Sequence, residues 1–270
     1  MAAINLELPK LKLHFEDNWE KSRCQIAELE YKRFLTLLLW ITHGPRNECH
    51  LAADLLLNLS SCLQPRRPIS DHGVRKAEIE AYLLDEARRQ RFPATVLHPG
   101  HIVGTGWMPL NPAANFNPSV FADLAAGRQI ALPNLGRETL HHVHADDVAQ
   151  AFTHAMTHWS AAVGESFHVA SPAAVSMAGY AEAVAAWFGQ QAHVRFLPWE
   201  EWRSTVPEKD AKITWDHIAR PPACNIGKAE RLLDYRPRYR SLEAVRELAM
   251  WLVDHGVIEA RISEATSGMK

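Results

Sequence analysis

The spacing of apolar positions changes near residue 70. Beyond that point, segments with apolar residues every three or four positions alternate with short apolar runs that are typical of strands. The first such segment runs to about Gln90 and gathers its apolar side chains on one helical face: Val74, Ala77, Ala81 and Leu84. The run FPATVLHPG follows and predicts a buried strand, which Pro99 and Gly100 close. Helices that alternate with strands predict an α/β fold.

The same alternation continues toward the C-terminus. Strands are predicted in TLHHVHA, ESFHVAS and HVRFLPW, and helices in PSVFADLAAG, DDVAQAFTHAMTH, MAGYAEAVAAWFG and SLEAVRELAMWLVDHG. Side chains that favour helix starts predict N-caps at Asp146 or Asp147 and at Ser241. We expect the last helix to end at Gly256, because glycine readily adopts the backbone conformation that ends helices.

The first 70 residues lack this alternation. FEDNWEKSRCQIAELEYKRFLTLLLWI favours one helix and ECHLAADLLLNLSSCL a second, so we expect an atypical, helical segment over residues 1–70. PRRPIS marks its boundary. The longest apolar run there, FLTLLLWI, is far shorter than the roughly 20 residues of a membrane-spanning helix. The charged residues before it are unlike a secretory signal, so the pattern predicts no membrane segment.

Composition narrows the class of protein. A 47% hydrophobic and 22% charged content is ordinary for a soluble globular chain, and the net charge of -2 offers no attraction to nucleic acid or anionic lipid. The four cysteines form no C-x-x-C pair and no zinc-ligand pattern: Cys24, Cys49, Cys62 and Cys224. Reduced thiols in a cytoplasmic protein are the simplest interpretation.

A histidine and a lysine stand four residues apart where the first predicted helix begins. His72 and Lys76 therefore share one helical face. Taken alone, such a pair is more often a loop histidine followed by a solvated lysine. The sequence motifs that follow the pair strengthen the interpretation of His72 and Lys76 as functional residues.

From Asp71 to about Gly256 the chain resembles the extended short-chain dehydrogenase/reductase family, also called the NAD-dependent epimerase/dehydratase family. HGVRKAEIEAYLL resembles the active-site helix, Y-G-x-x-K-x-x-x-E, and ATVLHPGHIVGTG resembles the next strand and loop, R-P-G-x-x-x-G-x-G. TLHHVHADDVAQAF resembles a later strand–helix unit. The resemblance covers about two-thirds of the chain. It implies an incomplete Rossmann-type parallel sheet with a smaller C-terminal α+β substrate domain.

The resemblance also implies site residues. Lys76 matches the lysine that holds the nicotinamide ribose of NAD or NADP, and His72 falls on the catalytic tyrosine. The loop that borders the nicotinamide corresponds to Pro99, Gly100 and His101, and His98 stands in place of the customary arginine. Substrate contacts correspond to Asn115 and Asn117. The family's catalytic serine or threonine has three unranked candidates: Thr36, Ser60 and Ser61.

The chain departs from the family at the catalytic position. Imidazole titrates near pH 6.5 and can serve as a general acid or base. Its nitrogens reach less far from the backbone than a tyrosine hydroxyl, and the neighbouring lysine cation disfavours imidazolium. His72 therefore predicts impaired proton transfer.

A second departure concerns the cofactor. Dinucleotide-binding sheets use a glycine-rich turn between a strand and a helix, but Gly44 is the single glycine before His72. Each βαβ unit takes about 30 or more residues, and only 71 residues precede His72. We therefore expect NAD(P) binding to be weak or absent, and a truncated or mis-joined N-terminal segment is one explanation.

These observations predict a division of the chain and two alternative functions. The Rossmann-like part comprises 71–104 and 140–170, the substrate-binding part 105–139 and 171–262, and the tail 263–270. One hypothesis is an epimerase, dehydratase or reductase that acts on a nucleotide sugar or another hydroxylated small metabolite. The other is a non-catalytic relative that serves as a binding or regulatory module. Family resemblance implies a homodimer formed through the Gly73–Gln90 helix.

Other patterns carry less weight. HHVHADD places His142 and His144 on one strand face, but the run fits a structural strand-to-helix junction better than a metal site. Trp199, Trp202 and Trp215 favour packing in the core or a cleft wall over stacking on a ligand. The short basic cluster RPRYR is too small to indicate nucleic-acid binding.

Overall fold

The computed structural model describes residues 37–40 and 71–258, and all of them belong to one unit of the chain, Thr36–Lys270. The predicted α/β class is confirmed, with parallel strand pairs and a small, incomplete sheet. None of the helices in the described ranges combines the length and apolarity that crossing a bilayer requires.

Three parallel strands form the largest sheet among the described residues, in the order β1-β2-β7. They are β1 (Leu37–Trp40), β2 (Ala94–Pro99) and β7 (Ser166–Val169). Leu39 pairs with Val96, and Leu97 pairs with Phe167. The helix predicted across Leu37–Trp40 is wrong there, because a buried parallel strand shows the same continuous apolar run as a helix segment.

Three short strand pairs complete the β structure. β3 (His101–Val103) pairs in parallel with β6 (His142–His144). β4 (Gln129–Pro133), which was not predicted, pairs in parallel with β9 (His193–Leu197). β5 (Thr139–Leu140) and β8 (Val175–Ser176) are antiparallel.

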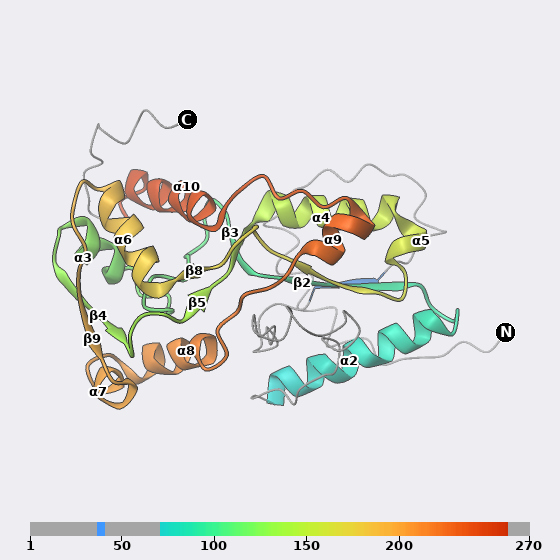
Figure 1. The fold of residues 1–270 in the computed structure, drawn as a ribbon, viewed down its shortest axis with the longest axis horizontal. Coiled ribbons are helices and arrows are strands. Elements are labelled where there is room, and N and C mark those ends of the chain that lie inside the picture. Colours follow the sequence, from blue (N-terminus) through green and yellow to red (C-terminus); the bar gives the residue numbers. More distant parts are fainter. Residues whose placement is uncertain (1–36, 41–70, 259–270) are drawn as a thin grey trace. The chain divides into compact units, whose positions relative to one another are not determined.

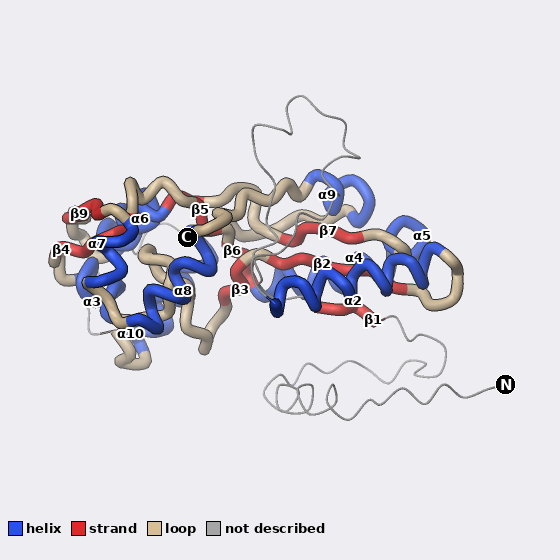
Figure 2. Tube along the Cα trace, turned by 90° about the horizontal axis from the view of Figure 1, so that it is seen from below, coloured by secondary structure: helices blue, strands red, loops and turns tan. Residues whose placement is uncertain are grey.

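The helices surround these strands. They are α2 (Asp71–Arg88), α3 (Ser119–Ala125), α4 (Ala145–Thr157), α5 (Trp159–Ala162), α6 (Met177–Trp187), α7 (Trp199–Ser204), α8 (Glu208–Ile218), α9 (Gly227–Leu233) and α10 (Ser241–Asp254). Figure 1 shows α2 on one face of the β1-β2-β7 sheet, with α4 and α9 on the other. In Figure 2, which is turned by 90°, α2 lies in front of the sheet. The predicted ends of the first helix agree with α2 to within two residues.

Two large apolar clusters lie in the described part of the chain, together with a small third one between α2 and β2 made of Leu83, Ala87 and Ala94. One lies around the β1-β2-β7 sheet and includes Leu97, Phe167 and Tyr235. The other lies around α3, α6 and α10 and includes Phe121 and Trp202. The domain division drawn from the sequence stays a prediction. We note that α9, which it assigned to the substrate-binding part, packs in the sheet's cluster.

The predicted N-caps are wrong at two helices. α4 is capped by His144, whose Nδ1 accepts the Asp146 N–H at 3.1 Å. α10 has Arg240 at its N-cap, and the Ser241 hydroxyl instead bonds Ser171 Oγ at 2.7 Å. In both cases the predicted capping residue bonds to a distant segment instead: Asp147 to the backbone of Arg238 and Tyr239, and Ser241 to Ser171.

Candidate active site

The predicted catalytic pair lies at the start of α2. His72 is in its first turn, and Lys76, whose side chain is half-buried, follows one turn later on the same face. One further turn along stands Glu80. The helix therefore presents positions 72, 76 and 80 in a row, as the sequence predicts. Whether His72 and Lys76 contact a substrate or cofactor stays a prediction.

Glu80 joins this helix to the sheet. Its Oε1 lies 2.9 Å from Nε2 of His98, and both side chains are less than a fifth exposed. His98 stands near the end of β2, and its ring meets the ring of His168 on β7 edge-on, with centroids 5.8 Å apart. The pair of His98 with the carboxylate of Glu80 joins α2 to the end of β2.

The loop after β2 is held by backbone contacts that require glycine. A Cβ at Gly100 would lie 2.4 Å from the carbonyl oxygen of His141, which leaves no room for a side chain. Gly100 N–H donates to Val169 O at 2.8 Å, and His101 N–H donates to His141 O at 2.7 Å. The sequence places Pro99, Gly100 and His101 beside a cofactor. In the structure Pro99 is the last residue of β2 and His101 the first residue of β3, so Gly100 lies at the carboxyl end of a parallel strand, where such sheets bind ligands.

The next two histidines along the chain, His141 and His142, are buried within the protein. His141 Nε2 lies 2.8 Å from Ser171 O, so that nitrogen donates, and Nδ1 accepts Cys224 N–H at 3.0 Å. Burial lowers the pKa of His141. The adjacent His142 is fully buried, and burial together with His141 lowers its pKa to about 3.

The two predicted substrate asparagines are used within the protein. Asn115 is buried; its Nδ2 donates to Thr214 Oγ1 at 3.2 Å, and its Oδ1 accepts from Asn111 Nδ2 at 2.7 Å. Asn117 Nδ2 donates to Asp210 Oδ2 at 3.2 Å. Both contacts join the loop after β3 to α8. A substrate contact by either asparagine stays a prediction, but these bonds already assign the amides a positioning role.

Sequence reasoning did not single out His217, on α8. Its ring centroid lies 4.8 Å from that of His101 and 6.2 Å from that of Phe116. The only sequence signal was its place in TWDHI, which drew attention to Trp215 instead. A helical histidine with no motif around it cannot be matched to a distant strand end from spacing alone.

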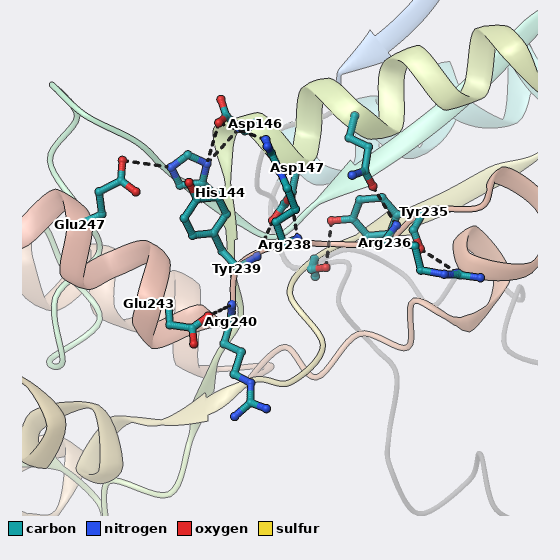
Figure 3. Close-up of polar contacts among 12 residues, drawn as sticks. His144, Asp146, Asp147, Tyr235, Arg236, Arg238, Tyr239, Arg240, Glu243 and Glu247 are labelled. Carbon is teal, nitrogen blue, oxygen red and sulfur yellow. Dashed lines mark hydrogen bonds and ion pairs between the residues drawn. The ribbon is translucent and has the colours of Figure 1, made fainter. Parts of the chain in front are cut away.

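A polar cluster connects α4 with the segment before α10 (Figure 3). Asp147 is fully buried and accepts the backbone N–H groups of Arg238 at 2.9 Å and Tyr239 at 3.2 Å. The His144 ring stacks on Tyr239 with centroids 4.0 Å apart, and its Nε2 lies 3.6 Å from Glu247 Oε1. The strand-to-helix junction that the sequence predicts is therefore the point where α4 and α10 are tied together.

The histidine-rich run does not form a metal centre with its described neighbours. Within residues 37–40 and 71–258, no three histidine, cysteine, aspartate or glutamate side chains are arranged to hold an ion. His142 instead packs edge-on against Tyr180, with ring centroids 5.3 Å apart.

The tryptophans behave largely as the sequence predicts. Trp202 is fully buried and its Nε1 donates to Ala131 O at 3.0 Å. Trp199 packs between Trp202 and the partly exposed Trp215, at ring-centroid distances of 5.5 and 5.0 Å. Other predictions lie outside the described residues, namely those at Thr36, Gly44, Ser60 and Ser61 and those at Cys24, Cys49 and Cys62.

Lys76 and the Pro99–His101 segment are the described residues that would meet the nicotinamide end of a dinucleotide, and that contact stays a prediction. Lys76 carries an ammonium group on α2. At the end of β2, Gly100 has no side chain, so its backbone lies close to that of His141. The pyrophosphate end would require a glycine-rich turn between a strand and a helix. Across the described ranges, no strand is followed by such a turn and helix.

Comparison with known proteins supports the family resemblance of the sequence. Residues 58–170 match the model of the NAD dependent epimerase/dehydratase family. No curated protein matches the chain.

Solved structures share the fold at low sequence identity. UDP-glucose 4-epimerase from Thermotoga maritima, solved with UDP-glucose, is 19% identical with a TM-score of 0.51, over 70% of this chain and 55% of that one. A dTDP-glucose 4,6-dehydratase from Bacillus anthracis, solved with NAD, is 16% identical with a TM-score of 0.54, over 72% and 55%. RMD from Pseudomonas aeruginosa, solved with NADPH, is 12% identical with a TM-score of 0.53, over 78% and 64%. The chain thus spans little more than half the length of the first two structures.

Proposed function

We propose that the protein, whose residues 58–170 match the model of the NAD dependent epimerase/dehydratase family, binds a nucleotide sugar at the carboxyl end of β2. We further propose that its NAD(P)-dependent chemistry is impaired. The observation that supports the proposal is the junction of α2 with β2, where Glu80, one helical turn after Lys76, pairs with His98, the residue before Pro99. Family members with nucleotide-sugar and dinucleotide ligands share this fold, which supports a small-molecule ligand of the same kind.

In this proposal each residue has a defined part in a redox step. A bound nicotinamide would supply hydride transfer to or from the substrate carbon. The imidazole of His72 takes the proton of the substrate hydroxyl as the carbonyl forms. Lys76 holds the ribose hydroxyls through its ammonium group, which also makes a second positive charge on His72 unfavourable. Proton transfer is therefore the step that the histidine weakens.

Fluorescence titration of the purified full chain with NADH and NADPH tests the cofactor half of the proposal. We expect no saturation in the micromolar range for either, and micromolar affinity for one of them would contradict it. Calorimetric titration with UDP-glucose and dTDP-glucose tests the substrate half. Binding of a sugar nucleotide without NAD(P)-dependent turnover would favour the non-catalytic binding module over an active enzyme.

A further inference from the structure

The contact between α2 and the sheet changes from apolar to polar along the helix. At the amino end of β2, Ala94 packs in one apolar cluster with Ala87 of α2. At the carboxyl end, Glu80 of α2 meets His98, with Oε1 2.9 Å from Nε2. His98 and Ala94 lie an even number of residues apart and therefore face α2 together, whereas Leu97 faces the apolar cluster on the opposite side of the sheet. The polar end of the contact is therefore a carboxylate–imidazole pair.

A second histidine stands beside His98 on the neighbouring strand. His98 and His168 are register partners in the parallel β2–β7 pair, and their rings meet edge-on with centroids 5.8 Å apart. Burial and, to a lesser degree, the neighbouring His98 lower the pKa of His168 to about 4. His168 is therefore neutral at neutral pH, and the ring that contacts the carboxylate of Glu80 is that of His98.

The titratable groups around His98 in the described part of the chain come from α2, β7 and the segment before β6. α2 contributes Glu80 and, one turn earlier on the same face, Lys76. β7 contributes His168, on which His141 also disfavours a positive charge. Of these groups, Glu80 favours a positive charge on His98, and Lys76 and His168 do not. The charge of His98 therefore acts chiefly on its contact with Glu80.

The proton positions on His98 follow from its partner. Nε2 lies against a carboxylate oxygen, and an ionised carboxylate only accepts, so Nε2 carries a proton whether the ring is neutral or charged. A second proton is taken up at Nδ1, and the side chain is 14% exposed, so the ring has a route to solvent. This proton turns a neutral hydrogen bond into an ion pair at the same contact. Charge-assisted hydrogen bonds are roughly twice as strong as neutral ones.

We propose that the Glu80–His98 pair is a pH-sensitive contact between α2 and the sheet. When His98 takes up a proton, α2 is held more firmly to the carboxyl end of β2, and when His98 loses it, α2 separates from β2 more readily. Because α2 also carries His72 and Lys76, the contact couples solution pH to the helix of the predicted catalytic pair. The inference is independent of whether the protein binds a nucleotide sugar or NAD(P).

A double-mutant cycle on the full chain measures the contact. Urea unfolding at pH 5.5 and pH 8.0 compares the wild type with Glu80→Ala, His98→Ala and the double variant. The coupling factor is the ratio by which the two changes depart from independence in the unfolding equilibrium constant. It should be about fivefold larger at pH 5.5 than at pH 8.0, because the contact is then charged. Effects of the other histidines on stability cancel in the cycle, since all four proteins contain them.

Two controls separate this contact from general effects of pH. His98→Arg replaces the imidazole with a guanidinium that stays charged in this range, so its coupling to Glu80 should be the same at both pH values. Lys228 and Glu165 form an ion pair without a histidine, with Nζ and Oε2 2.7 Å apart. The same cycle on that pair should also give one coupling factor at both pH values.

Nitrogen-15 spectra of the labelled imidazoles follow the wild type directly, with the His98 signals identified by their loss in His98→Ala. Between pH 8.0 and pH 5.5, Nδ1 of His98 should move to the shift of a protonated nitrogen, while Nε2 keeps that shift throughout. Amide exchange in α2, corrected for its intrinsic pH dependence and compared with that in α10, should slow severalfold over the same interval.

The outcomes are distinct. A coupling factor between Glu80 and His98 that is the same at both pH values would overturn the proposal, and so would an Nδ1 signal that does not change. An equal pH dependence in the His98→Arg cycle or in the Lys228–Glu165 cycle would reject a specific role for the histidine. Each result leaves the proposed function untouched, because sugar-nucleotide binding is measured separately by calorimetry.

Discussion

Glu80 Oε1 lies 2.9 Å from His98 Nε2, and this contact joins the third turn of α2 to the end of β2. Glu80→Ala would leave the imidazole of His98 largely buried without its carboxylate. Loss of a partner for a buried polar group costs about 1–3 kcal/mol, so we expect the free energy of unfolding to fall by that amount. Urea denaturation measures it. The control is Glu78→Ala, an exposed position on the same helix, for which we expect a change within about 0.5 kcal/mol.

Gly100→Ala tests the close approach of the loop to His141. The added methyl group would lie 2.4 Å from a backbone carbonyl oxygen, which cannot move aside as a flexible side chain can. We expect a loss of about 1–3 kcal/mol in stability or a failure to fold.

Gly104→Ala is the matched control for that variant. It directly follows β3, four residues beyond Gly100, and its new methyl group would meet only the side chain of Ala145, at 3.2 Å. It should therefore cost less. Equal losses for the two variants would contradict a specific requirement for glycine at position 100.

Acid should destabilise the folded chain below about pH 6.5. Burial lowers the pKa of each of four histidines: to about 3 for His142, to about 4 for His168, and by a smaller amount for His141 and His217. Unfolded histidines take up protons near pH 6.5, so below that pH the unfolded state binds more protons and stability falls as pH falls.

The expected slope is on the order of 1 kcal/mol per pH unit for each such histidine, extending down toward pH 4 for His168 and pH 3 for His142. Urea unfolding at pH 7.5, 6.5 and 5.5 measures it. His168→Gln removes one of these groups and should give a shallower dependence. A stability that stays constant between pH 7 and 5.5 would be inconsistent with buried, neutral histidines.

Restoring the family tyrosine by His72→Tyr should not by itself produce robust turnover. The substitution improves the proton-transfer group, but our proposal places a second deficit in dinucleotide binding. The check is NADH formation with UDP-glucose as substrate, alongside NADH titration of the same variant. Robust NAD(P)-dependent turnover by His72→Tyr would show that the histidine alone was the obstacle.

The strong periodic segments of this chain were predictable, and the side-chain partners were not. The helix of the α2 segment follows from its spacing, but its face does not: the buried apolar residues are Leu83 and Ala87, whereas Ala81 of the predicted apolar face is exposed. A helix was predicted across Leu37–Trp40, where the structure has a strand, because an apolar run of four residues fits a strand and a helix equally well.

The same limit applies to the site. Ser241 and Asp147 have ideal capping side chains, but each bonds to a distant segment that local sequence does not reveal. His217 meets His101 across more than a hundred residues of chain, so no motif could have paired them.

The contact of Asp147 with Arg238 and Tyr239 has a consequence for hydrogen exchange. Those two amides lie in an irregular segment before α10, where exchange with solvent is ordinarily fast. Because the fully buried side chain of Asp147 accepts a hydrogen bond from each amide, they should exchange only when α4 and this segment separate. Their exchange rates would therefore measure how often the tie between α4 and α10 opens.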